Sequence, residues 1–177
     1  MSTLGLHPLL TETDRVEIRL TALNDCAPEM ARAQFRRCCG SSQWVRRMEQ
    51  ARPFSSLAEL EACADRIWTS CHREDWLEAF SAHPRIGEQS QNRWSRQEQS
   101  SVGAVVPSVM ESLAEANRAY LDKFGYIFIV CATGKSAEEM LALLKQRLGN
   151  RADIEIQNAA EQQRLILQLR LRKLLTE

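Results

Sequence analysis

The sequence predicts an all-α fold, a single-domain helical bundle of about seven to nine helices without a substantial sheet. Glycine and proline are sparse, at 7 and 5 of 177 residues, while the helix-favouring residues Ala, Leu, Glu, Gln and Arg are abundant. Apolar residues recur at helical intervals in several segments. We therefore expect one helical domain over residues 1–177, with residues 1–14 as a loosely attached N-terminal segment.

In the first half of the chain, helices are expected over residues 27–39, 42–51, 56–71 and 73–80. Asp25 can cap the first of these, which should end at Gly40. The second stops before Pro53. The third opens with Ser56-x-x-Glu59, the spacing of a capping box. The fourth, REDWLEAF, runs into a loop that contains a histidine.

In the second half, helices are expected over residues 107–124, 136–149 and 152–175. Pro107 suits a first helical turn. Ser136 and Glu139 form a capping box, and Gly149 ends that helix. The last helix is apolar at too many positions for a coiled-coil seam, which favours core packing and leaves a homodimer contact open.

The segment Tyr126–Ala132, YIFIVCA, departs from the helical pattern. Its β-branched and aromatic residues suit a buried strand, but the sequence has no second segment of that kind to pair with it. We expect an extended or irregular chain buried between helices. Its unpaired amide and carbonyl groups could then serve a ligand.

Composition excludes several classes of protein. Lys+Arg and Asp+Glu are equal at 23 each, whereas nucleic-acid binders usually carry a basic excess. No apolar run approaches the roughly 20 residues of a membrane span, and no signal peptide is visible. The six cysteines form no C-x-x-C pair, so we expect reduced, mostly buried thiols and no metal site. These features predict a cytoplasmic protein.

His83 is the strongest candidate for chemistry. It lies where the helical pattern ends, and Pro84 restricts its backbone to extended conformations, which fixes where the imidazole points. Glu98 follows fifteen residues later across a polar loop, and a carboxylate that meets an imidazole can orient it and tune its protonation. From the residues alone, a helix-end packing role for His83 and a solvated surface charge at Glu98 stay open.

The order of the sequence segments resembles the 2-oxo-4-hydroxy-4-carboxy-5-ureidoimidazoline (OHCU) decarboxylases of urate breakdown over roughly residues 20–175. The stretches LTALNDCAPEMARAQF, AHPRIG, SRQEQ and ANRAYLDKFGYIFIVCATGK carry the resemblance. The chain departs from the family where Arg85 replaces an acidic residue, where SSVGAVV replaces an Ala-Gly pair, and where Ile127 replaces a proline. Its loop between Gly87 and Ser95 is also short.

The resemblance implies cofactor-independent decarboxylation of OHCU, a small molecule, to (S)-allantoin and CO2, the last step of urate conversion to allantoin. It implies catalytic roles for His83 and Glu98, and neither a cofactor nor a metal. The substrate-binding residues that it implies are Pro84, Ser95, Gln99, Tyr126, Ile127, Phe128, Ile129, Val130 and Arg170. Arg164 or Arg172 could serve in place of Arg170.

Two functions from other classes stay open. The first is a non-catalytic helical adaptor that docks through its apolar last helix. The second is a metal-dependent hydrolase that uses His83, Glu98 and the pair Cys71-His72.

Overall fold

The computed structural model describes residues 11–84 and 107–177, which form eight helices and no strand. The helices are α1 (Glu12–Asp25), α2 (Pro28–Cys38), α3 (Ser42–Gln50), α4 (Leu57–Thr69), α5 (Arg73–Ser81), α7 (Pro107–Phe124), α8 (Ala137–Leu148) and α9 (Ala152–Thr176). The predicted all-α class is confirmed. None of the helices in these ranges is both long enough and apolar enough to span a bilayer.

Local capping chemistry accounts for several of the predicted boundaries. The Ser136 hydroxyl accepts a hydrogen bond from the Glu139 N–H at 3.2 Å, and the Glu139 carboxylate accepts one from the Ser136 N–H at 2.7 Å. Ser56 caps α4 by accepting from the Glu59 N–H at 3.1 Å. The Glu59 carboxylate, however, binds the N–H of Ser55 at 2.7 Å, one residue earlier than in a capping box.

The N-terminal helices differ from the prediction. Asp25 does not cap α2, because it is the last residue of α1; Ala27 is at the N-cap, and Pro28 begins α2 without a donor that needs capping. The helix α1 was not predicted. It begins with a capping box between Thr11 and Asp14, so the described end of segment 1–14 is helical. A loose attachment of residues 1–10 stays a prediction.

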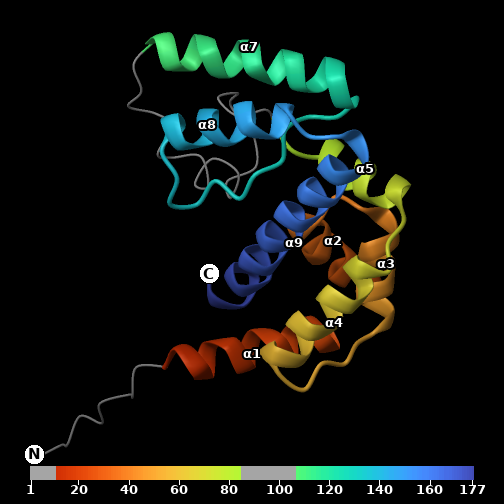
Figure 1. Ribbon diagram of the computed structural model, residues 1–177. Helices are drawn as coiled ribbons and strands as arrows, with labels where there is room; N and C mark the ends of the chain where they lie inside the picture. The colour runs from red at the N-terminus through yellow and green to blue at the C-terminus, as the bar shows by residue number, and fades with distance from the viewer. Residues whose placement is uncertain (1–10, 85–106) are drawn as a thin grey trace, which may run out of the picture.

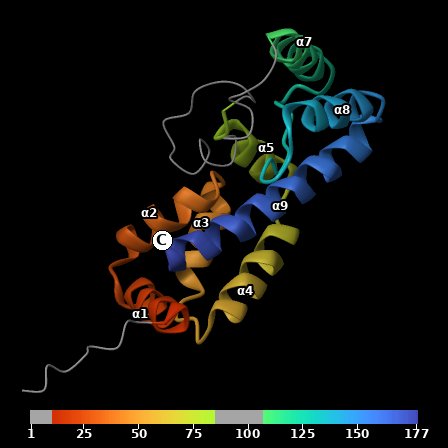
Figure 2. The same cartoon turned by 90° about the vertical axis from the view of Figure 1, so that its left-hand side faces the viewer.

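The helix α9, 25 residues long, is the element to which most others attach. It packs against α1, α2, α4 and α5, while α7 packs against α8. Figures 1 and 2 show α7 and α8 side by side near the start of α9, with α1 to α4 grouped toward its C-terminal end. The indole of Trp68 joins α4 to α9 by donating to the carbonyl of Ala160 at 2.9 Å.

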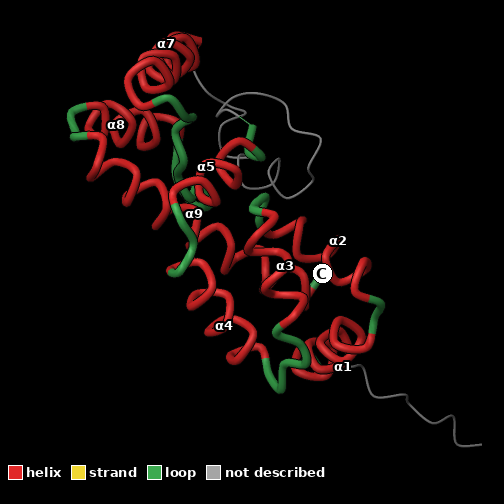
Figure 3. Tube along the Cα trace, turned by 90° about the vertical axis from the view of Figure 1, so that its right-hand side faces the viewer, coloured by secondary structure: helices red, strands yellow, loops and turns green. Residues whose placement is uncertain are grey.

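The segment 126–132 connects α7 to α8 as an irregular chain, drawn as a loop in Figure 3. Tyr126, Phe128, Ile129 and Val130 are buried in the core, and Ile127 is half-buried. The prediction of a buried, irregular apolar stretch is therefore confirmed.

Candidate active site

His83 lies just beyond the C-terminal end of α5. Ala82 is the C-cap, and the His83 N–H donates to the carbonyl of Phe80 at 3.1 Å, as in a last helical turn. Pro84 then follows, and proline disfavours a helical conformation in the residue before it. The helix thus ends just before His83, where the His-Pro order predicts, and His83 is half-buried.

The loop between α2 and α3 fixes the position of this helix end. A Cβ atom at Gly40 would lie 2.4 Å from the Cβ of Ala82, so only glycine permits this approach. The Glu78 carboxylate also accepts hydrogen bonds from the N–H and hydroxyl of Ser42, at 2.8 and 2.6 Å. Together these contacts hold the C-terminal half of α5, and therefore the imidazole beyond it, against the α2–α3 corner.

Two buried polar side chains of α9 lie close to His83. Gln163 and Arg170 are 0% and 5% exposed, and their spacing of seven residues places them on one face of the helix, two turns apart. Burial of the His83 imidazole and the nearby Arg170 charge lower its pKa to about 3, although the Gln163 side chain favours the protonated ring. The imidazole is therefore neutral at physiological pH.

Gln163 was not predicted as a site residue. Its amide lies close enough to His83 to favour the imidazolium, yet neither its Nε2 nor its Oε1 atom has a hydrogen-bond partner of good geometry among the described residues. An unpaired buried amide is costly, and such groups tend to mark functional sites. The available signal was a polar residue at an apolar position of the helix, four residues before Leu167.

Two thiols near Arg170 are chemically inert. Burial raises the pKa of both Cys38 and Cys39 to about 12, despite the opposing charge of Arg170. Both thus stay protonated at neutral pH, and a thiolate is the nucleophilic form of cysteine. The predicted reduced, buried thiols are confirmed at these two positions.

The segment 126–130 reaches the same region. The rings of Tyr126 and Phe80 pack with their centroids 5.4 Å apart, which places the start of the segment beside the last turn of α5. The Tyr126 hydroxyl is buried without a hydrogen-bond partner of good geometry among the described residues. Within that part of the chain, the N–H groups of residues 127–130 also have no acceptor.

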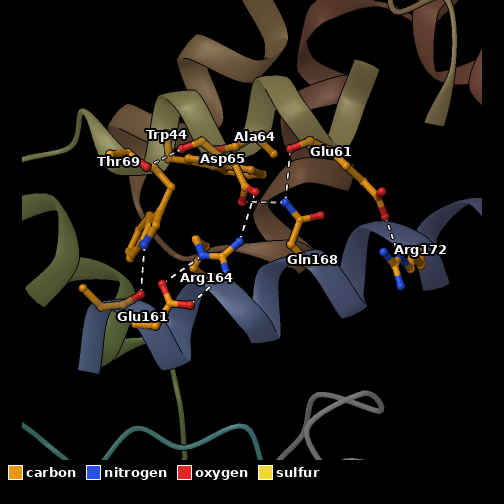
Figure 4. Close-up of polar contacts among 11 residues, drawn as sticks. Trp44, Glu61, Ala64, Asp65, Thr69, Glu161, Arg164, Gln168 and Arg172 are labelled. Carbon is orange, nitrogen blue, oxygen red and sulfur yellow. Dashed lines mark hydrogen bonds and ion pairs between the residues drawn. The ribbon is translucent and has the colours of Figure 1, made fainter. Parts of the chain in front are cut away.

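The three candidate arginines of α9 do not all lie on one side of the helix. Arg164 pairs with Asp65 of α4 at 3.0 Å, and Arg172 pairs with Glu61 of α4 at 2.5 Å. Figure 4 shows both contacts along the α4 side of the helix. They border a groove of about 540 Å³ between α4 and α9, away from His83. Of the three, only Arg170 lies beside the imidazole.

The remaining predicted residues either lie apart from His83 or fall outside the residues that the structure describes. Ser95, Glu98 and Gln99 fall in residues 85–106, outside the described ranges. Cys71 and His72 precede α5, whereas His83 follows it, so a helix of nine residues, roughly 14 Å long, separates them. The described residues contain no cluster of three or more His, Cys, Asp or Glu side chains arranged to hold a metal.

Residues 24–172 match the family model for OHCU decarboxylase. This chain belongs to the OHCU decarboxylase family. A crystal structure titled as OHCU decarboxylase in the presence of (S)-allantoin superimposes with a TM-score of 0.75 and 39% identity, covering 86% of this chain and all of the other. A crystal structure of (S)-allantoin synthase matches with a TM-score of 0.68 at 19% identity, over 88% of this chain and 54% of the other, which supports the fold alone.

Curated relatives come from distant organisms. A uric acid degradation bifunctional protein of Arabidopsis thaliana is 38% identical over 85% of this chain and 49% of its own length. A protein of the same description from Bacillus subtilis is 30% identical over 77% of this chain and 28% of its own length. The chain therefore spans half or less of these two proteins. An OHCU decarboxylase of Haloferax volcanii is 29% identical over 73% of this chain and 80% of its own length.

Proposed function

We propose that this member of the OHCU decarboxylase family converts OHCU to (S)-allantoin and CO2, without a cofactor and with protonation of a single face. The observation that carries the proposal is the neutral His83 imidazole beside the buried cation Arg170, at the junction of α5 and α9. A proton acceptor next to a carboxylate-binding group is the pairing that decarboxylation of a hydroxy acid requires.

In the proposed reaction, Arg170 holds the substrate carboxylate. The bond between that carboxylate and the ring carbon breaks, and its electron pair forms a C=C bond with the neighbouring carbon. The electrons of the ring C=N bond move to nitrogen, which takes up a proton. The substrate is thus its own electron sink.

His83 acts as the acid and base in this proposal. The substrate carboxylate, paired with Arg170, offsets the positive charge that lowers the imidazole pKa, so that His83 accepts the proton of the substrate hydroxyl as the carbonyl of allantoin forms. The carbon that bears the ureido group then receives a proton on the face that His83 presents. Glu98 is proposed to orient the imidazole, Ser95, Gln99 and Pro84 to contact the ligand, and the N–H groups of 126–130 to bind the ring and ureido group.

The test is to supply freshly generated OHCU, made from urate by oxidation and ring hydrolysis, and to follow enantiopure allantoin by circular dichroism. We expect His83→Ala to lower kcat at least ~100-fold, the usual scale for loss of a general acid or base. His72→Ala, at the opposite, exposed end of α5, is the matched control and should retain activity. A His83→Ala protein with a near-normal rate would place the chemistry elsewhere.

We also propose that the chain forms one domain, acts in the cytoplasm and pairs as a homodimer. Most apolar residues of α9 are buried within the chain, while Ile154 and Leu165 stay 52% and 37% exposed and could contact a second copy. Sedimentation of the wild type against Leu165→Glu tests the dimer, and cell fractionation tests the location.

A further inference from the structure

A buried ion pair joins α8 to α9 outside the residues considered so far. Glu155 is completely buried, and its carboxylate accepts hydrogen bonds from Arg147 Nε at 2.7 Å, from Asn150 Nδ2 at 2.7 Å and from the hydroxyl of Tyr120. Burial alone would raise the pKa of Glu155, but these hydrogen bonds lower it below its usual value. The carboxylate is therefore ionised and fully engaged.

Stability alone is a weak explanation for such a pair. Two desolvated charges gain roughly as much from each other as they lose from water, and apolar residues of similar volume often serve a core as well or better. The ion pair is better explained as a means of orienting one specific group. Both Nε and Nη2 of Arg147 contact Glu155 Oε1, at 2.7 and 2.5 Å, and this two-atom contact holds the guanidinium in a single orientation.

That guanidinium acts on the segment 126–130. Arg147 Nη1 donates to the carbonyl oxygen of Ile129 at 2.8 Å, and its guanidinium carbon lies 4.6 Å from the centre of the Phe128 ring. Two residues on, the N–H of Cys131 donates to Gln162 Oε1 of α9 at 3.0 Å. The segment has no sheet partner, so these contacts define its backbone orientation among the described residues.

The geometry of the peptide group gives the consequence. In a trans peptide the C=O of one residue and the N–H of the next point in opposite directions. Because the Ile129 C=O is directed to Arg147, the N–H of Val130 is directed away from α8. That N–H has no acceptor among the described residues, and it belongs to the segment whose Tyr126 packs beside the last turn of α5.

We propose that Arg147, held by Glu155, is a positioning residue that turns the Ile129–Val130 peptide so that the Val130 N–H faces the ligand. This inference rests on the proposed function, since it assigns a role in binding the same substrate. Arg147 itself does not touch the ligand. Its role is to fix a backbone donor that no side chain could replace.

The test separates positioning from stability by comparing two variants. Arg147→Lys keeps the charge but replaces a planar guanidinium, which serves Glu155 and Ile129 at once, by a single ammonium. Lys123→Met is the matched control: Lys123 joins α7 to the connection between α8 and α9, through the carbonyl of Asn150 at 2.9 Å, and no hydrogen bond of its side chain to residues 126–130 is found among the described residues. Both variants should lower the Tm.

We expect Arg147→Lys to raise KM and the Kd for (S)-allantoin about tenfold, the scale of one lost ligand hydrogen bond, with kcat changed less than about threefold. Lys123→Met should leave KM unchanged. An equal KM in both variants would overturn the inference. So would changes in KM that are proportional, in both variants, to the loss of Tm. If the wild type converts no OHCU, the proposed function fails instead, so the two failures are distinguishable.

A second measurement uses the wild type alone and does not depend on the folding of any variant. On titration with (S)-allantoin, the backbone amide resonance of Val130 should shift together with the imidazole resonances of His83. A ligand that shifts His83 but leaves the Val130 amide unmoved contradicts the positioning role.

Discussion

Lowering the pH from 7 to 5 should destabilise the folded protein through His83. The pKa of its imidazole falls from an ordinary 6.5 to about 3 on folding. Burial is the larger cause, and the positive charge of Arg170 is the smaller one. Below pH 6.5 the unfolded chain therefore binds a proton that the folded chain does not accept. That difference favours unfolding increasingly as the pH falls toward 3, so the stability contributed by the neutral imidazole is fully present only above pH 6.5.

The magnitude follows from linkage. Between pH 7 and pH 5 the change in the free energy of unfolding from this one group is about 2 kcal/mol, and it depends little on the folded pKa so long as that value lies below 5. Other groups also titrate in this range. His83→Gln keeps a polar side chain without a titrating group, so the difference between wild type and variant isolates the imidazole.

Urea unfolding followed by far-UV circular dichroism, at pH 7, 6 and 5, measures this difference. We expect the wild type to lose about 2 kcal/mol more than His83→Gln on going from pH 7 to 5, with most of the extra loss between pH 6 and 5. Parallel pH dependences for the two proteins would refute the reasoning. They would show that His83 takes up its proton in the folded state as readily as in the unfolded one.

Three further predictions follow from the site. Arg170→Met should lower kcat/KM roughly 10- to 100-fold, the scale of a charge-assisted hydrogen bond, while Arg164→Met on the α4 side should change it less than about twofold in the same steady-state assay. Gly40→Ala should lower the Tm and the activity, because its Cβ would meet Ala82 at 2.4 Å; an unchanged Tm and rate would contradict the proposed role of this corner. Exhaustive treatment with EDTA should leave the rate unchanged, and a rate that zinc restores after chelation would exclude the cofactor-free reaction.

The helices were largely predictable because their boundaries are local. Ser136-x-x-Glu139 and Gly149 mark the ends of α8, and Pro107 marks the start of α7, through contacts within a few residues. The prediction for Asp25 was wrong for a local reason too, because an Asp can cap the following helix or end the preceding one. With Asp25 as the cap, α2 would begin at residue 26, but it begins at Pro28.

The site was predictable only in part. Helical periodicity places Arg164 and Arg172 about 80° apart and Arg170 more than about 100° from either, so the sequence separates the two sides of α9. It does not say which side meets His83, because that depends on how α4 and α5 pack. Gln163 was missed for the same reason: its polar side chain at an apolar helical position is visible in the sequence, but its burial beside His83 comes from tertiary packing.

The burial of Arg170 also bears on turnover. In the proposed reaction the substrate arrives as an anion whose carboxylate faces this cation, at 5% exposure and therefore with little screening by water. Allantoin and CO2 carry no such charge. The reaction thus removes the group that the arginine attracts, and product affinity falls below substrate affinity without any movement of the protein. Loss of the carboxylate in the reaction therefore favours release of the product.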